Sequence, residues 1–147
     1  MTMRGDRFVD TTIFLTATAA HRTGHAAAVA LLEAGSSDRS MFISGQVLRE
    51  CLVLATRPMA ANGLGLALPD ALENVTQFRE RANLLGEDAS VHNTLMDLMK
   101  RVPSFGKQIH DANIGATMIA HGVLRLVTLN PGDFARFAPE IQVSGLD

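Results

Sequence analysis

The stretch RFVDTTIFL, residues 7–15, decides how the rest of the chain is interpreted. Its apolar and β-branched side chains are typical of a buried β-strand, yet Asp10 stands in its middle. A carboxylate removed from water costs on the order of several kcal/mol unless something pairs with it. We therefore expect a strand over residues 7–15 that ends at a metal site, where a cation replaces the lost hydration of Asp10. The alternative is that Asp10 anchors a purely structural hydrogen bond.

The overall composition is that of an ordinary globular protein, with 147 residues of which 47% are hydrophobic and 19% charged. One domain over residues 1–147 is expected, because this length can bury a core without disulfides. The single cysteine, Cys51, has no partner in the chain, which suits a reducing cytoplasm. No run approaches the roughly 18 apolar residues of a membrane helix, and the first residues lack the pattern of a signal peptide. A cytoplasmic protein without membrane contact is expected.

The net charge of −2 gives no global sign of nucleic-acid binding. A local basic rim can still steer RNA, and the candidates are Lys100, Arg101 and Lys107. Phe105 beside them is a candidate for base stacking, although packing in the core is the favoured interpretation.

The hydrophobic pattern switches several times between period two and period 3.6, which predicts an α/β fold with a parallel sheet. Strands are expected at 41–43 and 123–128, with an edge strand at 141–143. Helices are expected at 25–34 with an exit at Gly35, at 46–56 with Ser44 as N-cap, and at 109–122. Asp70 and Glu73 predict a capping box for a further helix. Its apolar face would run from Leu72 to Leu85, and a second stripe runs from Val91 to Val102.

Four acids lie just after a strand or on a largely apolar helix: Asp10, Glu50, Asp111 and Asp133. Ligand sites in parallel sheets gather at the carboxyl ends of the strands, so these side chains are expected to meet. Converging carboxylates repel one another unless a cation is present, and hard oxygen ligands favour Mg²⁺ or Mn²⁺. Such a site suits hydrolysis of a phosphodiester by water that the metal activates.

Each acid also has a structural explanation. Asp111 and Asp133 are equally well explained as N-caps or first-turn residues. Glu50 could instead pair with Arg57, two turns along the same helix face. His21 and His25 have the spacing of a metal pair, but nothing nearby supplies a third ligand, so two surface histidines are favoured.

Several other phosphate-handling folds fit less well. The strand pattern LRLVTL argues against the all-helical HD phosphohydrolases. A haloacid-dehalogenase-like phosphatase needs a second Asp where Thr12 stands. The response-receiver fold needs adjacent acids near the first strand and a late lysine, neither of which is present. A nucleotide-binding Rossmann domain needs a glycine-rich turn that TTIFLTATA lacks.

Four motifs in this order carry a family resemblance: RFVDTTIFL, FISGQVLREC, HDANIGATMIAHG and LRLVTLNPGDFARF. From residue 7 to 143 the chain resembles the PIN-domain ribonucleases, and more narrowly the VapC-type toxins of toxin–antitoxin pairs. The resemblance makes Asp10, Glu50 and Asp111 metal-site acids, with Thr12 as a supporting hydroxyl. Family members place a fourth acid at position 130, at 133 or at both. Because position 130 is Asn here, Asp133 is the expected acid, with Asn130 and Thr128 as polar helpers.

The resemblance implies a three-layer α/β/α sandwich around a parallel sheet, a PIN-like fold. It also implies a Mg²⁺- or Mn²⁺-dependent endoribonuclease without an organic cofactor, a homodimer, and a cognate VapB-type antitoxin. The helices between 70 and 102 are where relatives dimerise or grip the antitoxin, but their stripes fit an ordinary core equally well. The alternatives are a catalytically inactive PIN-like binding module, which Asn130 favours, and another metal-dependent phosphohydrolase.

Overall fold

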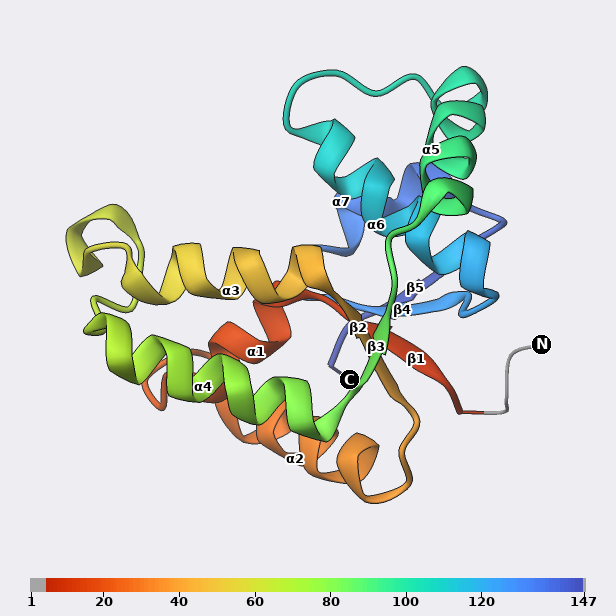
Figure 1. Ribbon diagram of the computed structural model, residues 1–147. Helices are drawn as coiled ribbons and strands as arrows, with labels where there is room; N and C mark the ends of the chain where they lie inside the picture. Colours follow the sequence, from red (N-terminus) through yellow and green to blue (C-terminus); the bar gives the residue numbers. More distant parts are fainter. Residues whose placement is uncertain (1–4, 147) are drawn as a thin grey trace.

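The computed structural model describes residues 5–146 and has a five-stranded sheet at its centre (Figure 1). All pairings are parallel, and the strand order is β3-β2-β1-β4-β5. The strands are β1 (Arg7–Val9), β2 (Met41–Ser44), β3 (Asn83–Leu85), β4 (Arg125–Val127) and β5 (Gln142–Ser144). The first strand therefore lies in the middle of the sheet, between β2 and β4.

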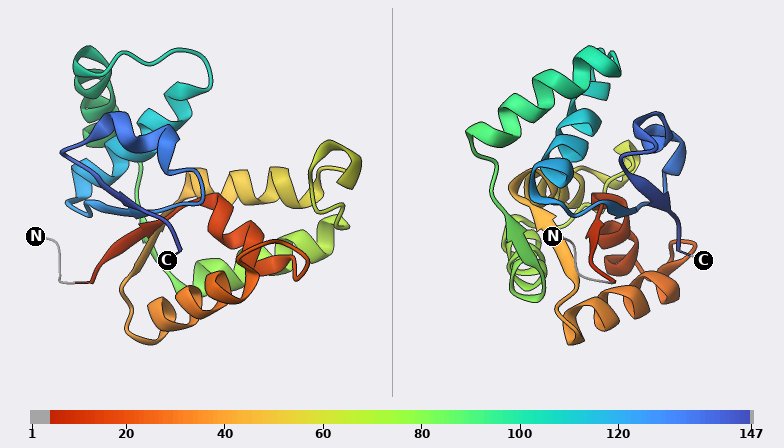
Figure 2. Two further views of the ribbon diagram at one scale, coloured as in Figure 1. Left: turned by 180° about the vertical axis from the view of Figure 1, so that it is seen from behind. Right: turned by 90° about the vertical axis from the view of Figure 1, so that its right-hand side faces the viewer.

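Helices cover both faces of this sheet. They are α1 (Thr11–Thr18), α2 (His25–Ser37), α3 (Gly45–Thr56), α4 (Leu68–Arg81), α5 (Ala89–Arg101), α6 (Gln108–His121) and α7 (Pro131–Phe134), with short 3₁₀ turns η1 (Met59–Ala61) and η2 (Ala135–Phe137). Helices α1, α2 and α4 lie on one side, and α5, α6 and α7 on the other (Figure 2). The predicted three-layer α/β/α architecture is confirmed. Over residues 5–146, no helix is both long and apolar enough to cross a membrane.

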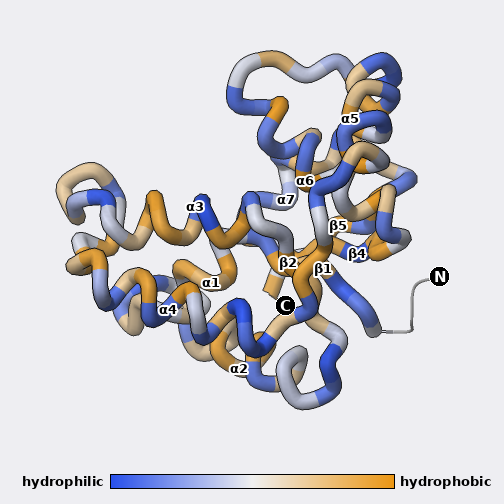
Figure 3. The backbone as a smooth tube through the Cα atoms, viewed as in Figure 1, coloured by the Kyte–Doolittle hydropathy of each residue, from blue (hydrophilic) through white to orange (hydrophobic). Residues whose placement is uncertain are grey.

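The core is centred on the middle strands, which are among the hydrophobic segments of the chain (Figure 3). Phe8, Ile43 and Leu126 are completely buried. Phe8 is in register with Phe42 of β2 and with Leu126 of β4. Because the strands are parallel and in register, the residues that follow β1, β2 and β4 emerge at one edge of the sheet.

The predicted strand through Leu15 is wrong, because β1 ends at Val9 and α1 starts at Thr11. Asp10 is the N-cap of α1, and its Oδ1 accepts a hydrogen bond from the backbone N–H of Thr11 at 2.8 Å. The segment TTIFL has β-branched residues, but as a helix it buries Ile13, Phe14 and Leu15 in the core. Tertiary packing and the cap thus override the local strand propensity.

Two predicted helix ends are also wrong. Helix α2 runs through Gly35 to Ser37, and Gly35 serves close packing instead of a helix exit, since a Cβ there would meet Met41 at 3.0 Å. Helix α4 begins at Leu68 after Ala67, so Asp70 lies in its first turn and does not form the predicted capping box.

One strand was not predicted. Residues 83–85 form β3, where an extension of the helical face to Leu85 was expected. The segments 41–43, 46–56, 91–102, 109–122 and 123–128, and the edge strand at 141–143, match observed elements to within a few residues. Ser44 is the N-cap residue of α3 as predicted, but its side chain makes no capping hydrogen bond.

Candidate active site

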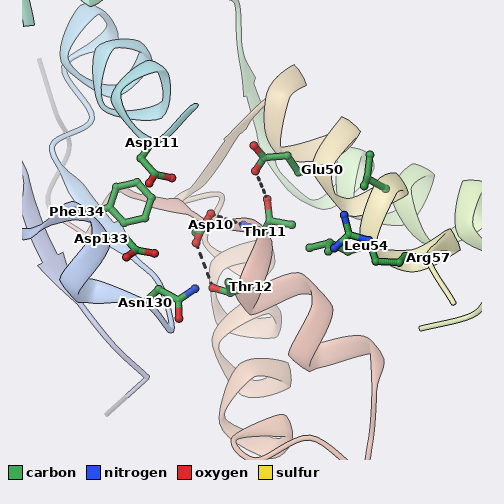
Figure 4. Close-up of a pocket in the computed structure, with 11 residues that line it drawn as sticks. Asp10, Thr11, Thr12, Glu50, Leu54, Arg57, Asp111, Asn130, Asp133 and Phe134 are labelled. Carbon is green, nitrogen blue, oxygen red and sulfur yellow. Dashed lines mark hydrogen bonds between the residues drawn. The ribbon is translucent and has the colours of Figure 1, made fainter. Parts of the chain in front are cut away.

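A cavity of about 280 Å³ opens beside the carboxyl ends of the central strands. All four predicted acids line it, and their side chains point toward one common space (Figure 4). Asp10 comes from the β1–α1 junction, Glu50 from the second turn of α3, Asp111 from the first turn of α6 and Asp133 from α7. Acids separated by more than a hundred positions in sequence are therefore brought together as predicted.

Asp10 is the most tightly held of the four, and only 6% of it is exposed. Its Oδ1 accepts from the N–H of Thr11 at 2.8 Å, and its Oδ2 accepts from the hydroxyls of Thr128 at 2.7 Å and Thr12 at 3.2 Å. Burial raises the pKa of Asp10, and these hydrogen bonds oppose the rise. A carboxylate has roughly four lone-pair positions, so these three donors leave one on Oδ1 for a further ligand.

Thr128 and Thr12 tie the loop after β4 to the start of α1. The Thr128 hydroxyl accepts from the N–H of Asn130 at 3.0 Å while it donates to Asp10. The Thr12 hydroxyl accepts from the N–H of Leu129 at 3.1 Å. Asn130 lines the cavity with an exposed side chain, whereas its backbone makes the contact to Thr128. All three predicted supporting residues thus lie at the site.

Glu50 is held at both carboxylate oxygens. Its Oε1 accepts from the Thr11 hydroxyl at 3.0 Å and its Oε2 accepts from the Gln46 side-chain amide at 3.0 Å. The alternative pairing with Arg57 does not form, although both residues line the cavity. The ion pairs of Lys100 with Asp97 and of Arg101 with Glu140 involve none of the residues that line the cavity.

Asp111 and Asp133 complete the acidic wall. The pKa of Asp111 is raised to about 6, chiefly by burial and then by the negative charges of Asp133, Asp10 and Glu50, while Arg136 opposes the rise. Asp111 and Asp133 lie in the first turns of α6 and α7, but the N-cap positions belong to Lys107 and Asn130. The first-turn interpretation is therefore correct for both, and the N-cap interpretation is wrong.

The donor set fits a hard divalent cation in its chemistry. Four carboxylates face one cavity, and burial together with the neighbouring negative charges raises the pKa of Asp111. Within residues 5–146, no three acids, histidines or cysteines are already arranged to hold a metal ion. Mg²⁺ does not require such a cage, because it keeps several waters and commonly takes one or two protein carboxylates. Asp133 is exposed, so its carboxylate can rotate toward the other three.

A wider groove of about 690 Å³ adjoins this cavity and shares Glu50, Asp111 and Asp133 with it. Basic side chains line this groove, namely Arg49, Arg57, Lys107 and His110. Of the three residues predicted to form a basic rim, only Lys107 lines this groove. Lys100 and Arg101 form ion pairs with acids outside it. Phe105 is 75% exposed, so its predicted packing in the core is wrong.

Sequence analysis missed Thr11, Gln46 and Arg49 as residues of the site. The available signals were adjacency and helical spacing: Thr11 follows Asp10, Arg49 precedes Glu50, and Gln46 lies one turn before Glu50 on the same helix face. Adjacency and spacing identify these residues as part of the site only when the structure shows which helices and loops face them.

Comparison with solved structures gives neighbours of the same fold over nearly the full chain. A VapBC2 complex from Rickettsia felis bound to a promoter DNA fragment aligns with TM-score 0.69 and 19% identity, covering 96% of this chain and 98% of that one. A DNA-bound VapBC complex from Salmonella typhimurium aligns with TM-score 0.69 and 22% identity, covering 97% and 98%. VapC20 of Mycobacterium tuberculosis, a toxin that cleaves the sarcin-ricin loop, aligns with TM-score 0.62 and 19% identity, covering 82% and 87%.

A comparison with curated proteins gives no match. The family model of the PIN domain, in contrast, matches residues 7–139, a segment that contains β1 to β4 and all four acids. Since this match spans most of the sequence and agrees with the observed sheet, the chain belongs to the PIN-domain family.

Proposed function

We propose that the protein is a metal-dependent endoribonuclease and the toxin of a VapBC-type toxin–antitoxin pair. One observation carries the proposal: four acids from four separate segments converge in one cavity at the carboxyl edge of the sheet. The similarity to VapC proteins supports the same assignment. Asp10, Glu50, Asp111 and Asp133 are the proposed metal-site residues, and Thr12, Thr128 and Asn130 the supporting ones.

The carboxylates would hold Mg²⁺ or Mn²⁺, which supplies an activated water and compensates the charge that develops on the phosphate. Asp10 suits the central ligand position, because three hydrogen bonds hold its carboxylate in one orientation. Thr11 and Gln46 orient Glu50 in the same way. The nucleophile in this proposal is water, and its attack on phosphorus displaces one ester oxygen of the RNA backbone. No protein side chain becomes covalently attached.

An acidic cavity repels a polyanion such as RNA. The adjoining groove supplies positive charge that can bind it. Arg49, Arg57 and Lys107 line it within the same hollow as Glu50 and Asp111. These cations can bind phosphates on either side of the bond to be cut. Phe105 lies exposed two residues before Lys107, where a splayed base can stack on its ring. A single-stranded or looped RNA is the substrate class that fits this arrangement.

The proposal includes a VapB-type antitoxin, a homodimer and a cytoplasmic location. Two of the structural neighbours are VapBC complexes, which supports the partner. The turn η1 and the first two turns of α4 expose apolar side chains, with Met59 69%, Leu68 58% and Leu72 47% exposed. Exposed apolar side chains that gather into one surface are typical of a protein–protein contact.

Cleavage of total RNA by antitoxin-free protein tests the nuclease function. The reaction is run with Mg²⁺, with Mn²⁺ and with EDTA, for the wild type and for Asp10→Asn. We expect defined fragments only with metal. We also expect Asp10→Asn to lose more than the roughly 10- to 100-fold typical of residues that merely orient a metal ligand.

Asp97→Asn is the matched control, since Asp97 is an exposed acid on α5 that pairs with Lys100. It should cleave like the wild type. If wild type and Asp10→Asn are equally inert on every RNA while both bind a partner protein, the protein is an inactive PIN-like binding module.

A further inference from the structure

Gln46 occupies a position at which a polar side chain is costly. It lies in the first turn of α3 and is 4% exposed. A buried amide without hydrogen bonds destabilises a protein by about 1–3 kcal/mol, and an apolar side chain of similar size would avoid this cost. A glutamine at this buried position therefore needs hydrogen-bond partners for its side-chain amide.

The structure supplies those partners completely. The Gln46 Nε2 donates to Glu50 Oε2 at 3.0 Å and to the carbonyl oxygen of His110 at 2.8 Å. The Gln46 Oε1 accepts from Asn113 Nδ2 at 2.7 Å. The carboxylate and the backbone carbonyl can only accept, so this orientation of the amide is the one that satisfies all three contacts.

These contacts join two helices around the acidic cavity. Glu50 belongs to α3, while His110 and Asn113 belong to the first two turns of α6, on either side of Asp111. The segment after β3 joins the same cluster through Glu87, whose Oε1 accepts from the Gln46 backbone N–H at 3.0 Å. Gln46 thus sits where the helix of one acid meets the helix of another.

We propose that Gln46 is a positioning residue for Glu50: its amide holds the Glu50 carboxylate facing the cavity, at a set separation from Asp111. This inference rests on the proposed function, because it assigns Glu50 to a metal-binding site. Glu50 Oε1 is held from the other side by Thr11, next to Asp10. Because both oxygens are already held, Glu50 loses little conformational entropy when a cation binds. The smaller entropy loss makes cation binding tighter.

The first test compares Mn²⁺ affinity of the wild type with that of Gln46→Met, measured by electron paramagnetic resonance on the antitoxin-free protein. Met keeps the length of the side chain and removes all three hydrogen bonds of the amide group. We expect about 10-fold weaker Mn²⁺ binding, within the range typical of residues that orient metal ligands. In RNA cleavage the loss should appear in kcat, with KM for RNA little changed.

Gln77→Met is the matched control. Gln77 also donates from Nε2 to a glutamate one turn away, Glu73, at 3.2 Å, but it lies exposed on α4. Mn²⁺ affinity and kcat should be unchanged in this variant. Thermal unfolding of both variants shows whether the fold is retained.

A double-mutant cycle separates positioning of Glu50 from a general effect on α6. In a Glu50→Ala background, adding Gln46→Met should change Mn²⁺ affinity by less than about 2-fold, because the group through which Gln46 acts is gone. If the full 10-fold loss persists in this background, Gln46 acts through Asp111 or through the fold, and the proposal is overturned.

A metal-free measurement distinguishes failure of this inference from failure of the nuclease assignment. In NMR spectra of ¹⁵N-Gln-labelled protein, the side-chain amide protons of Gln46 should exchange with solvent more slowly than those of Gln77, and should accelerate in Glu50→Ala. If the wild type neither binds Mn²⁺ nor cleaves RNA, the nuclease assignment fails, and this measurement alone decides whether Gln46 holds Glu50. Equal exchange of the two glutamine side chains would refute the inference in either case.

Discussion

At the scale of single residues, Asp10 has two tasks that the same carboxylate performs with different oxygens. Oδ1 caps α1 through Thr11, and Oδ2 receives the hydroxyls of Thr128 and Thr12. The cap places the acid at the strand end, and the hydroxyls stabilise its charged form against burial. Local hydrogen bonds thus offset part of the cost of burying this charge, while burial still raises the pKa of Asp10.

Replacement of Thr128 tests this account. Thr128→Val keeps the shape of the side chain but removes the donor to Asp10 and the acceptor for the Asn130 N–H. We expect the pKa of Asp10 to rise above its wild-type value and the protein to lose about 1–3 kcal/mol of stability at neutral pH. ¹³C NMR titration of the Asp10 carboxyl and urea unfolding measure the two effects.

Thr128→Ser retains the hydroxyl, so the pKa of Asp10 should stay near its wild-type value. An equal rise in both variants would mean that packing, and not the hydrogen bond, sets the pKa of Asp10.

The four acids could be predicted from sequence because each stands where a soluble fold rarely tolerates an uncompensated charge, or where the family resemblance places one. The residues that hold them could not. Thr11, Gln46 and Arg49 are ordinary helix residues in the sequence, and their roles depend on which element faces them. Glu50 shows how far prediction from sequence reaches. Its place at the acidic cavity was predicted, but its hydrogen bonds from Thr11 and Gln46 could not be read from the hydrophobic pattern.

At the scale of elements, the end of α3 shows how the chain closes a helix near the site. The returning segment caps its last carbonyls: the N–H of Leu64 donates to Leu54 O at 3.0 Å and that of Leu66 to Ala55 O at 2.9 Å. Arg57, which lines the cavity, is the C-cap residue, and its carbonyl accepts from Gly65 N at 2.8 Å. This close return leaves no room for a side chain at Gly63, where a Cβ would overlap the carbonyl of Arg57.

Gly63→Ala should therefore lower the free energy of unfolding by about 1–3 kcal/mol, the usual cost of an overpacked site. Urea unfolding measures the change. Gly86→Ala is the matched control, because a Cβ at Gly86 has nothing within 4 Å. A similar loss of stability in both variants would mean that replacing glycine with alanine destabilises any loop of this protein. It would contradict the explanation by close packing at Gly63.

The elements that sequence analysis found and missed differ in length and in amphipathic pattern. Helix α5 has a clear amphipathic stripe and helix α6 ends at a glycine, Gly122, and both lie where the sequence placed them. Strand β3 has only three residues, directly after the polar α4, so its sequence carries too few positions for a period of two to be recognised. Helix α1 was missed for the opposite reason: almost all of its first turns are buried, and uniform burial removes the polar face that distinguishes a helix from a strand.

At the scale of the whole molecule, the acidic cavity makes stability depend on pH. The pKa of Asp111 is raised to about 6 from an ordinary value of 3.8, so the folded protein holds this proton more tightly than the unfolded chain. The corresponding stabilisation is complete below the ordinary value and is lost as the pH rises through about 6. The raised pKa of Asp10 acts in the same direction.

In EDTA, the free energy of unfolding should accordingly fall between about pH 4 and pH 7, and this decline should be smaller in Asp111→Asn. Mn²⁺ should restore stability at pH 7.5 and lose its effect below about pH 6, where protons compete for the same oxygens. Urea titrations over this pH range, with Asp97→Asn as control, measure both trends. A decline that is identical in wild type and Asp111→Asn would assign it to other groups.

The central place of β1 also bears on when the acidic cavity can form during synthesis of the chain. β1 is made well before its neighbour β4 and before Thr128 and Asp133, which follow it by more than a hundred positions. A nascent chain that has not yet reached β4 therefore carries Asp10 beside an open edge of β1, without the Thr128 hydroxyl and without Asp133. The acidic cavity can close only once the segment from β4 to α7 has been made, so none of the residues that come before this segment can complete the site alone.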